Sequence, residues 1–365
     1  MKRGISLLLV CGLLIGAMPF AAAAAKYSDV SKDAWYAQAV DYVTEHGLMQ
    51  GTGNGQFSPD LSLTRAQFVT LLHRLAGSPS ADISGLPFGD VAPEAYYAPG
   101  VAWANQNGIV TGTTATSFTP NRAINREQMA AILYRYVQTT GKQLPNAKNP
   151  VYGFKDAWYV SDYAVNGVEL VWHTGIMNGD SQYNFGPKIA VSRAEAADVF
   201  MRLDRCLSGE SLTVSVRNTT PNYAAMSQRE KTAQALTVAK QIASVIPKEG
   251  SDLDRVSIAA QIVSYYCSFC AYTMSGSDYR TPFGVFVKGE YSCAGATRAL
   301  GLVLDCLGYQ WTHVNENQYD HQWCSLYMDG QLGFADGQTG IAGYGEHWGI
   351  MFSLAESDSF PLCAG

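Results

Sequence analysis

One pattern recurs three times in the first 205 residues of this 365-residue chain, and it limits the possible folds more than any other feature. A glycine is followed after 6, 8 and 14 residues by phenylalanine, proline and arginine. The copies are Gly51, Phe57, Pro59, Arg65; Gly112, Phe118, Pro120, Arg126; and Gly179, Phe185, Pro187, Arg193. An aspartate precedes each glycine by 22 or 23 residues: Asp29, Asp90 and Asp156. Such a period indicates an array of similar units that share one core.

Each copy contains two stretches with helical periodicity. In the first copy these are Ala37–His46, which ends before Gly47, and Ala66–Leu75. The second helix of each copy opens on a capping pair, in which an N-cap side chain and a residue three positions later satisfy each other's backbone N–H groups. The pairs are Thr64 with Gln67, Asn125 with Gln128, and Ser192 with Glu195. The repeats are therefore predicted to form an all-α domain.

An arginine at the first helical position has no such local explanation. A cation there is mildly unfavourable because the helix N-terminus carries partial positive charge, yet Arg65, Arg126 and Arg193 all occupy it. One interpretation is a salt bridge to the upstream aspartate of the same repeat. The other is an anion clamp, in which the guanidinium and free helix N–H groups face an acidic ligand.

The segment from about Tyr27 to Arg205 resembles three consecutive S-layer homology modules. The resemblance rests on Leu63–Gln67, Ile124–Gln128 and Val191–Glu195, with the Gly-x5-Phe-x-Pro lead-in. It implies a three-lobed helical domain that binds secondary cell-wall polysaccharide, often pyruvylated, in grooves between lobes. On that analogy Arg65, Arg126 and Arg193 meet the carboxylate, and Asp29, Asp90 and Asp156 shape the grooves. The third copy fits the family motif best, so equal affinity in all grooves is not expected.

The first 25 residues have the pattern of a secretory signal peptide. Lys2 and Arg3 precede an apolar run from Ile5 to Phe20 and a small-residue stretch from Ala21 to Ala25. The run is shorter than the roughly 20 residues needed to span a bilayer. We therefore expect an exported protein without a membrane span after cleavage, associated with a Gram-positive-type cell wall. The net charge of −6 is opposite to that of a nucleic-acid binder.

The region after the repeats combines helical and strand patterns. Helices are predicted over Ser227–Ile246, Asp252 to about Tyr272, and Cys293–Leu307. Strands are predicted over Trp311–Val314, Gln322–Met328 and Gln331–Ala335, with a hairpin turn at Asp329-Gly330. Helices followed by an antiparallel sheet indicate an α+β domain. The whole chain is thus predicted to be multidomain: signal peptide 1–25, repeats 26–77, 86–141 and 150–205, linker 206–224, and C-terminal domain 225–365.

Three residues of this C-terminal domain are candidates for nucleophilic catalysis. Cys293 opens a predicted helix, where the dipole favours the thiolate. His321 precedes the first hairpin strand and Asp336 follows the second. Pairing around the two-residue turn brings His321 and Asp336 close together, as a base and the group that orients it require.

The order of these motifs resembles the transglutaminase-like superfamily of papain-like proteins. The motif residues are Ser292–Ala296, His321-Gln322-Trp323, Asp329-Gly330 and Asp336. The resemblance implies a peptidase, amidase or transamidase acting on peptide or protein amides, without a cofactor or metal. Tyr291 stands where the family usually has glycine, and a tyrosine there crowds the cleft. The alternative is a non-catalytic wall-binding or scaffold protein with a degenerate domain of this fold.

The other histidines and cysteines are weaker candidates for a catalytic or metal-binding role. His313 is the rival base, and His347 is too far beyond the hairpin to be favoured. Cys267-x-x-Cys270 lacks the preceding strand of a redox motif, and a zinc site with Cys306 and Cys324 lacks a second short-spaced pair. Structural disulfides or buried thiols are the favoured interpretation. Seven cysteines follow the signal segment, an odd count that suits a free Cys293.

Overall fold

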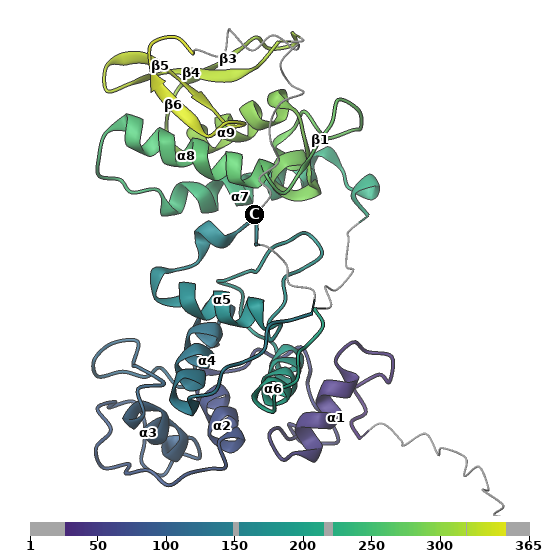
Figure 1. The fold of residues 1–365 in the computed structure, drawn as a ribbon, viewed down its shortest axis with the longest axis vertical. Coiled ribbons are helices and arrows are strands. Elements are labelled where there is room, and N and C mark those ends of the chain that lie inside the picture. The colour runs from purple at the N-terminus through teal and green to yellow at the C-terminus, as the bar shows by residue number, and fades with distance from the viewer. Residues whose placement is uncertain (1–25, 149–152, 215–221, 319, 348–365) are drawn as a thin grey trace, which may run out of the picture.

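The computed structural model describes residues 26–148, 153–214, 222–318 and 320–347. The predicted signal peptide, residues 215–221 of the predicted linker and the chain after His347 lie outside the described residues. The described chain forms a helical repeat domain and a C-terminal domain that lie one above the other along the long axis (Figure 1).

Six α-helices form the described part of the repeat domain, two from each repeat. They are α1 (Ala37–Glu45), α2 (Arg65–Leu75), α3 (Ala98–Gln106), α4 (Arg126–Thr140), α5 (Val165–His173) and α6 (Arg193–Leu207). In the third repeat two short 3-10 turns, η1 (Ala157–Tyr159) and η2 (Asp162–Ala164), precede α5. All three predicted capping boxes are confirmed at the starts of α2, α4 and α6. Helix α6 continues two residues into the segment predicted as a linker.

The three repeats close into a ring through the residues just before these capped helices. The Leu63 N–H donates to the Val191 carbonyl at 2.8 Å, Ile124 to Leu63 at 2.9 Å, and Val191 to Ile124 at 2.9 Å. All three side chains are fully buried. The first and third repeats are therefore direct neighbours although about 130 residues separate them.

The C-terminal domain packs helices against one face of an antiparallel sheet. Helices α7 (Gln228–Val245), α8 (Asp252–Cys267) and α9 (Cys293–Leu307) precede the strands β3 (Trp311–Val314), β4 (Trp323–Met328), β5 (Gln331–Asp336) and β6 (Ile341–Tyr344). The sheet order is β3-β4-β5-β6, and Met328 pairs with Gln331 across the predicted Asp329-Gly330 turn. The predicted combination of helices and an antiparallel sheet is present.

One predicted helix is too long. The helix expected to reach about Tyr272 ends at Cys267, and Ala271–Tyr272 instead forms strand β1, parallel to β2 (Glu290–Tyr291). Between them, Gly284–Lys288 forms a π-helical turn, η4. This pairing positions the start of α9 and its first residue, Cys293, because β2 leads directly into α9.

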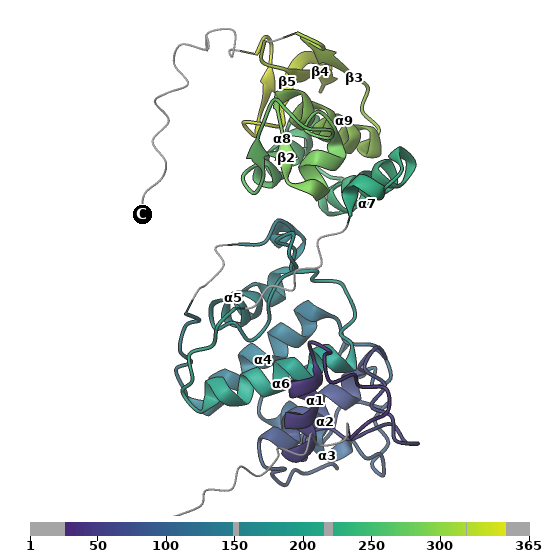
Figure 2. The same cartoon turned by 90° about the vertical axis from the view of Figure 1, so that its right-hand side faces the viewer.

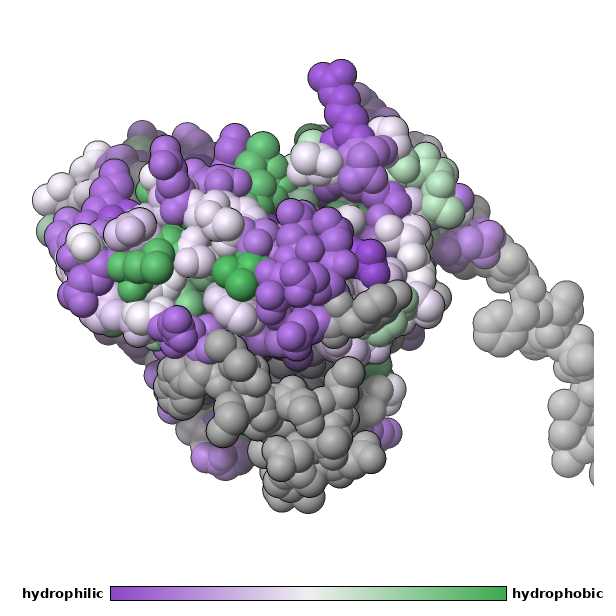
Figure 3. Space-filling model, turned by 90° about the horizontal axis from the view of Figure 1, so that it is seen from above, coloured by the Kyte–Doolittle hydropathy of each residue, from purple (hydrophilic) through white to green (hydrophobic). Residues whose placement is uncertain are grey.

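The third repeat contacts the C-terminal domain through aromatic residues. The Tyr265 hydroxyl of α8 donates to the Phe154 carbonyl at 2.9 Å, and the Trp158 and Tyr266 rings lie 6.1 Å apart. Figure 2 shows α5 of the third repeat below this junction and α7 and α8 above it. Seen from above, apolar residues form separate small patches among polar ones (Figure 3).

Candidate functional site

The repeat arginines reach into the neighbouring repeat instead of projecting into solvent. Arg65 Nε donates to the Phe118 carbonyl at 2.9 Å, and its carbon Cζ lies 4.7 Å from the centroid of the Phe118 ring. Arg126 makes the same two contacts with Phe185: its Nε donates to the carbonyl at 2.6 Å and its Cζ lies 4.7 Å from the ring centroid. Arg193 makes them with Phe57, at 2.8 and 4.7 Å. The three arginines are 5 to 7% exposed. Each therefore joins two repeats.

This geometry corrects two details of the interpretations: the free helix N–H groups and the salt bridge within one repeat. The helix N–H groups are not free, because the Arg193 and Ala194 amides donate to the Leu61 and Pro59 carbonyls of the next repeat, and α2 and α4 repeat the arrangement. The aspartates do not form salt bridges with the arginine of their own repeat. Asp29 accepts from the Phe57 and Ser58 amides at 2.8 and 2.7 Å.

The aspartates instead organise the turn on which the neighbouring arginine stacks. Asp90 binds the Phe118 and Thr119 amides and Asp156 binds the Phe185 and Gly186 amides. The charge of Asp29 acts on Arg193, a residue of the third repeat. Sequence spacing within one repeat could not reveal this, because the partner lies in the next repeat.

One guanidinium nitrogen remains available at two of the three seams. Nη2 of Arg65 and Arg193 donates to the Thr111 and Gln50 carbonyls, and Nη1 has no hydrogen-bond partner among the described residues. Nη1 of Arg126 lies 3.7 Å from the Glu195 carboxylate. These nitrogens are the part of the predicted clamp that the fold leaves open.

In the C-terminal domain, Cys293 is the first residue of α9, as predicted. The N-cap Ser292 makes no side-chain capping bond, in contrast to the capping boxes of α2, α4, α6, α7 and α8. The amides of Cys293, Ala294 and Gly295 have no hydrogen-bond acceptor within the part of the chain that the structure describes. This helix end can therefore stabilise negative charge beside the sulfur.

His321 lies between Cys293 and Asp336. Its Nε2 is 2.8 Å from Asp336 Oδ2, and Cys293 is close enough to act on the same ring. The Cys293 thiol donates to the carbonyl of Asp320, the residue before His321, at 4.0 Å. Burial by itself lowers the pKa of His321, but the hydrogen bonds and charges of Asp336 and Cys293 outweigh it and raise that pKa to about 9. The imidazolium is thus the stable form near neutral pH.

Asp336 is fully buried and bonded on both oxygens. Oδ1 accepts from the amides of Gln338 and Thr339, and Oδ2 also accepts from the Thr339 hydroxyl at 2.8 Å. Burial would raise the pKa of this carboxyl, yet the hydrogen bonds from His321 and His347 keep it below its usual value. A carboxylate held in this way fixes the orientation of an imidazole ring.

His347 is the site residue that the sequence analysis discounted wrongly. Its Nε2 lies 3.3 Å from Asp336 Oδ2, and its ring stacks on Trp323 with centroids 4.6 Å apart. The chain turns back after β6, which places His347 beside the start of β4. A prediction of strand β6 after the hairpin would have indicated that His347 lies close to Asp336. His313, the rival base, instead contacts Gln322 at 2.7 Å.

His321, Asp336 and His347 also lie close enough to share a divalent cation. One potential ligand atom from each lies within 4.8 Å of the other two. No group formed by Cys267, Cys270, Cys306 and Cys324 is among the potential metal-binding groups of the described residues. The six described cysteines, Cys206, Cys267, Cys270, Cys293, Cys306 and Cys324, are all free thiols. Of the two interpretations, disulfides or buried thiols, the structure thus favours thiols, and Cys206, Cys267 and Cys324 are buried.

Two tyrosines lie near the candidate nucleophile. Burial and the neighbouring Cys293 raise the pKa of Tyr272, and its ring meets that of Tyr291 edge-on at 5.3 Å. Tyr291 packs against the core of the C-terminal domain. Tyr291 is thus held by the core and by Tyr272, whereas Tyr272 is largely exposed.

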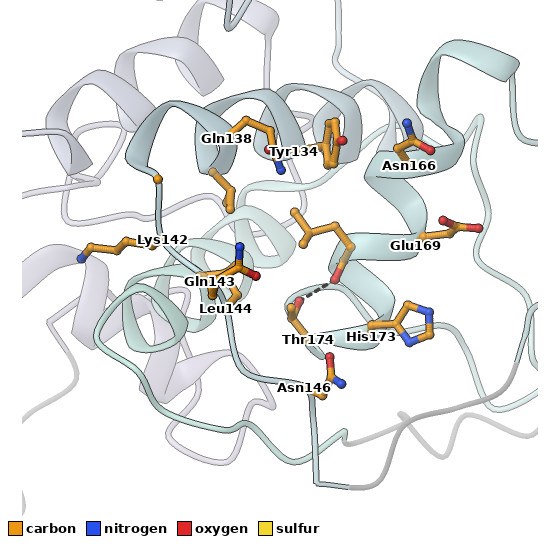
Figure 4. A pocket seen from close by; sticks show the side chains of 13 residues that line it. Tyr134, Gln138, Lys142, Gln143, Leu144, Asn146, Asn166, Glu169, His173 and Thr174 are labelled. Atoms are coloured by element: carbon orange, nitrogen blue, oxygen red, sulfur yellow. Dashed lines mark hydrogen bonds between the residues drawn. The ribbon is translucent and has the colours of Figure 1, made fainter.

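A separate hollow of about 620 Å³ lies between α4 and α5 (Figure 4). Polar side chains such as Gln138, Asn166 and His173 line it. Neither the repeat arginines nor Cys293 is among its lining residues, so it is not connected to the candidate chemistry.

The family comparison identifies the repeats. The model of the S-layer homology domain matches residues 26–69, 87–130 and 153–197. The chain carries three S-layer homology domains. The family match ends at residue 197, so the transglutaminase-like resemblance of the C-terminal domain stays a prediction.

Curated relatives agree with this result. An endoglucanase of Bacillus sp. (strain KSM-635) is 33% identical over 55% of this chain and 22% of its own length. The surface-layer 125 kDa protein of Lysinibacillus sphaericus is 30% identical over 52% of this chain and 16% of its own length. A cellulosome-anchoring protein of Acetivibrio thermocellus is 23% identical over 43% of this chain and 36% of its own length. The chain thus spans about a third or less of these relatives.

S-layer homology domains and S-layer relatives associate this protein with the cell surface of a Gram-positive-type envelope. Among the described residues, no helix combines the length and the apolar character that crossing a membrane requires.

Proposed function

We propose that the protein is an exported cysteine acyl-transfer enzyme, tethered by its S-layer homology domains to secondary cell-wall polysaccharide. The substrate is a peptide or protein amide, and the anchor's ligand is an acidic, pyruvylated saccharide. The observation that carries the catalytic part is His321, held between the Cys293 sulfur and the buried Asp336.

The anchor proposal is supported by arginines at the seams and by an exposed aromatic ring in each repeat. Nη1 of Arg65 and Arg193 is available for a carboxylate. Trp35, Tyr96 and Tyr163 occupy equivalent repeat positions and are 44, 65 and 52% exposed, unlike most of the apolar residues. Exposed aromatic rings beside hydrogen-bonding groups suit the mixed apolar and polar faces of a sugar.

The proposed reaction begins with the thiolate of Cys293. Its sulfur attacks the amide carbonyl carbon, and the carbonyl oxygen becomes an oxyanion that the uncapped amides at the start of α9 can stabilise. His321, protonated on the nitrogen facing the sulfur, gives that proton to the departing amine, and the C–N bond breaks. Asp336 keeps the ring oriented. Water or a second amine, deprotonated by neutral His321, then releases the acyl group from the thioester.

The second candidate is a wall-binding scaffold with a degenerate C-terminal domain. The observation in its favour is the position of Tyr272 close to Cys293, where a phenol stands near the sulfur that a substrate would have to reach. Tyr272 is 54% exposed, so a rotation of its side chain toward solvent would open the sulfur to a substrate.

Peptide-resolved alkylation separates the two candidates. The full chain is treated with limiting iodoacetamide at about pH 6, where ordinary thiols are almost fully protonated. Cys306 is the internal control, because it lies on the same helix, is partly exposed and has its pKa raised by burial. An acyl-transfer enzyme requires Cys293 to react at least about 10-fold faster than Cys306. Equal alkylation rates for Cys293 and Cys306 would contradict the enzyme and support the wall-binding scaffold.

The anchor is tested by changing the wall and leaving the protein intact. The full chain should sediment with purified wall that retains its polysaccharide, and should stay in solution when the polysaccharide has been extracted. Sedimentation with both preparations would show that another wall component is the ligand.

A further inference from the structure

The seam between the second and third repeats differs from the other two seams by one buried carboxylate. Glu127, the second residue of α4, is 3% exposed. Its carboxylate accepts from the Ser161 amide at 2.9 Å, the Ser161 hydroxyl at 3.2 Å and the Tyr163 hydroxyl at 3.0 Å. Lys188 Nζ donates to both of its oxygens, at 2.6 and 2.7 Å. These four residues form what we call the Glu127 cluster.

The donors of this cluster have the composition of a carboxylate-binding site. A backbone amide, two hydroxyls and an ammonium converge on two oxygens, and hydrogen bonds to ionised acceptors are the stronger kind. Lys188 also donates to the Ser161 hydroxyl at 2.6 Å, so its position is fixed. The ligand that fills the site is the chain's own side chain.

Neither of the other seams contains such a cluster. The position of Glu127 is Ala66 in the first repeat and Ala194 in the third. The positions equivalent to Ser161 and Lys188 are Glu94 and Asn121 at one seam, and Asp33 and Asp60 at the other. All four of these residues are exposed, so no donor set converges there on a buried carboxylate.

The Glu127 cluster also restrains an aromatic residue that the saccharide would need. Tyr163 is the counterpart of Trp35 and Tyr96. Burial, and the charge and hydrogen bond of Glu127, raise the pKa of Tyr163, while the charge of Arg65 acts in the opposite direction. The Glu127 carboxylate of the second repeat and the Arg65 guanidinium of the first repeat therefore both act on the Tyr163 phenol.

We propose that Glu127 closes this seam to acidic saccharides, so that the anchor binds two saccharides per chain and not three. This proposal rests on the proposed saccharide ligand. Glu127 occupies the oxygen positions of an incoming carboxylate and neutralises Lys188, while the seams with alanine at this position remain open. Removal of the carboxylate should expose Lys188, Ser161 and Tyr163 as a third site.

Isothermal titration of the full chain with a pyruvylated N-acetylhexosamine monosaccharide tests the proposal. The expected stoichiometry is two for the unaltered chain and three for Glu127→Ala. The matched control is the double variant Glu127→Ala with Lys188→Ala, which should return to two because the ammonium is gone. Circular dichroism confirms that each variant is folded before titration.

The outcomes distinguish this inference from the function on which it rests. Three saccharides on the unaltered chain, or an unchanged count in Glu127→Ala, would overturn the closed seam and leave the anchor proposal standing. An absence of binding in every variant would overturn the saccharide ligand itself. A gain of one site that depends on Lys188 supports the proposal.

Discussion

Replacing Asp336 with asparagine should lower the pKa of His321 until the ring is only about half protonated near pH 7, whereas in the unaltered chain it is an imidazolium there. The substitution keeps the size of the side chain and removes its charge. In the unaltered chain the pKa of His321 is raised from 6.5 to about 9 by Asp336 and Cys293 together. That shift corresponds to about 3 kcal/mol of preference for the protonated ring.

Most of this preference should vanish in Asp336→Asn. Asp336 supplies both the leading hydrogen bond and the leading charge, while burial of the ring acts in the opposite direction. The pKa of His321 should therefore fall by about 2 units, which is about 3 kcal/mol. Alkylation of Cys293 at about pH 8 should slow by roughly 10-fold, because a ring with a pKa of about 7 is mostly neutral at that pH and no longer places a cation beside the sulfur.

The assay combines nuclear magnetic resonance titration of the His321 ring with peptide-resolved alkylation. Cys306 again serves as the internal reference, and its rate should not change. His347 also bonds Asp336, so its ring resonance is followed in the same titration. An unchanged pKa of His321 in a folded Asp336→Asn protein would refute the reasoning, because the hydrogen bond at 2.8 Å would then have no electrostatic effect.

Three further predictions concern stability. Arg193→Ala should lower the free energy of unfolding of the repeat domain by about 2 to 4 kcal/mol, because the Phe57 and Gln50 carbonyls lose their donor. Urea unfolding measures this loss, and Arg193→Lys should recover only part of the stability. His347→Gln should destabilise the C-terminal domain by about 1 to 3 kcal/mol through loss of a bond to buried Asp336, with little change in the pKa of His321. The raised pKa of His321 stabilises the fold fully below about pH 6.5, and this stabilisation is lost as the pH rises through about 9. Thermal unfolding should therefore show a loss of stability at alkaline pH in the unaltered chain but not in His321→Gln.

The repeat domain could be predicted in outline because its signals are local and occur three times. A capping box is a contact between residues three positions apart, and Thr64, Asn125 and Ser192 all form it. The ring closure that joins Leu63 to Val191 could not be read in this way, because its hydrogen bonds join residues of different repeats. The bonds of the arginines to the neighbouring repeat could not be predicted for the same reason.

The C-terminal site shows the same limit. The turn at Asp329-Gly330 fixes the hairpin register, and the register brings His321 to Asp336. His347 follows strand β6, for which the sequence analysis predicted no element, so its contact with Asp336 was missed. The short strand at Ala271–Tyr272 was overlooked because its partner, β2, is a two-residue strand that packing stabilises.

The central claim is that Cys293 transfers acyl groups at the cell wall. The most direct measurement incubates the full chain with purified wall peptides and with a glutamine-containing protein, then analyses the products by mass spectrometry. The claim predicts cleaved or exchanged amide bonds with the unaltered chain and none with Cys293→Ala. Equal products from both chains, or no product from either when the chain is bound to wall, would contradict it.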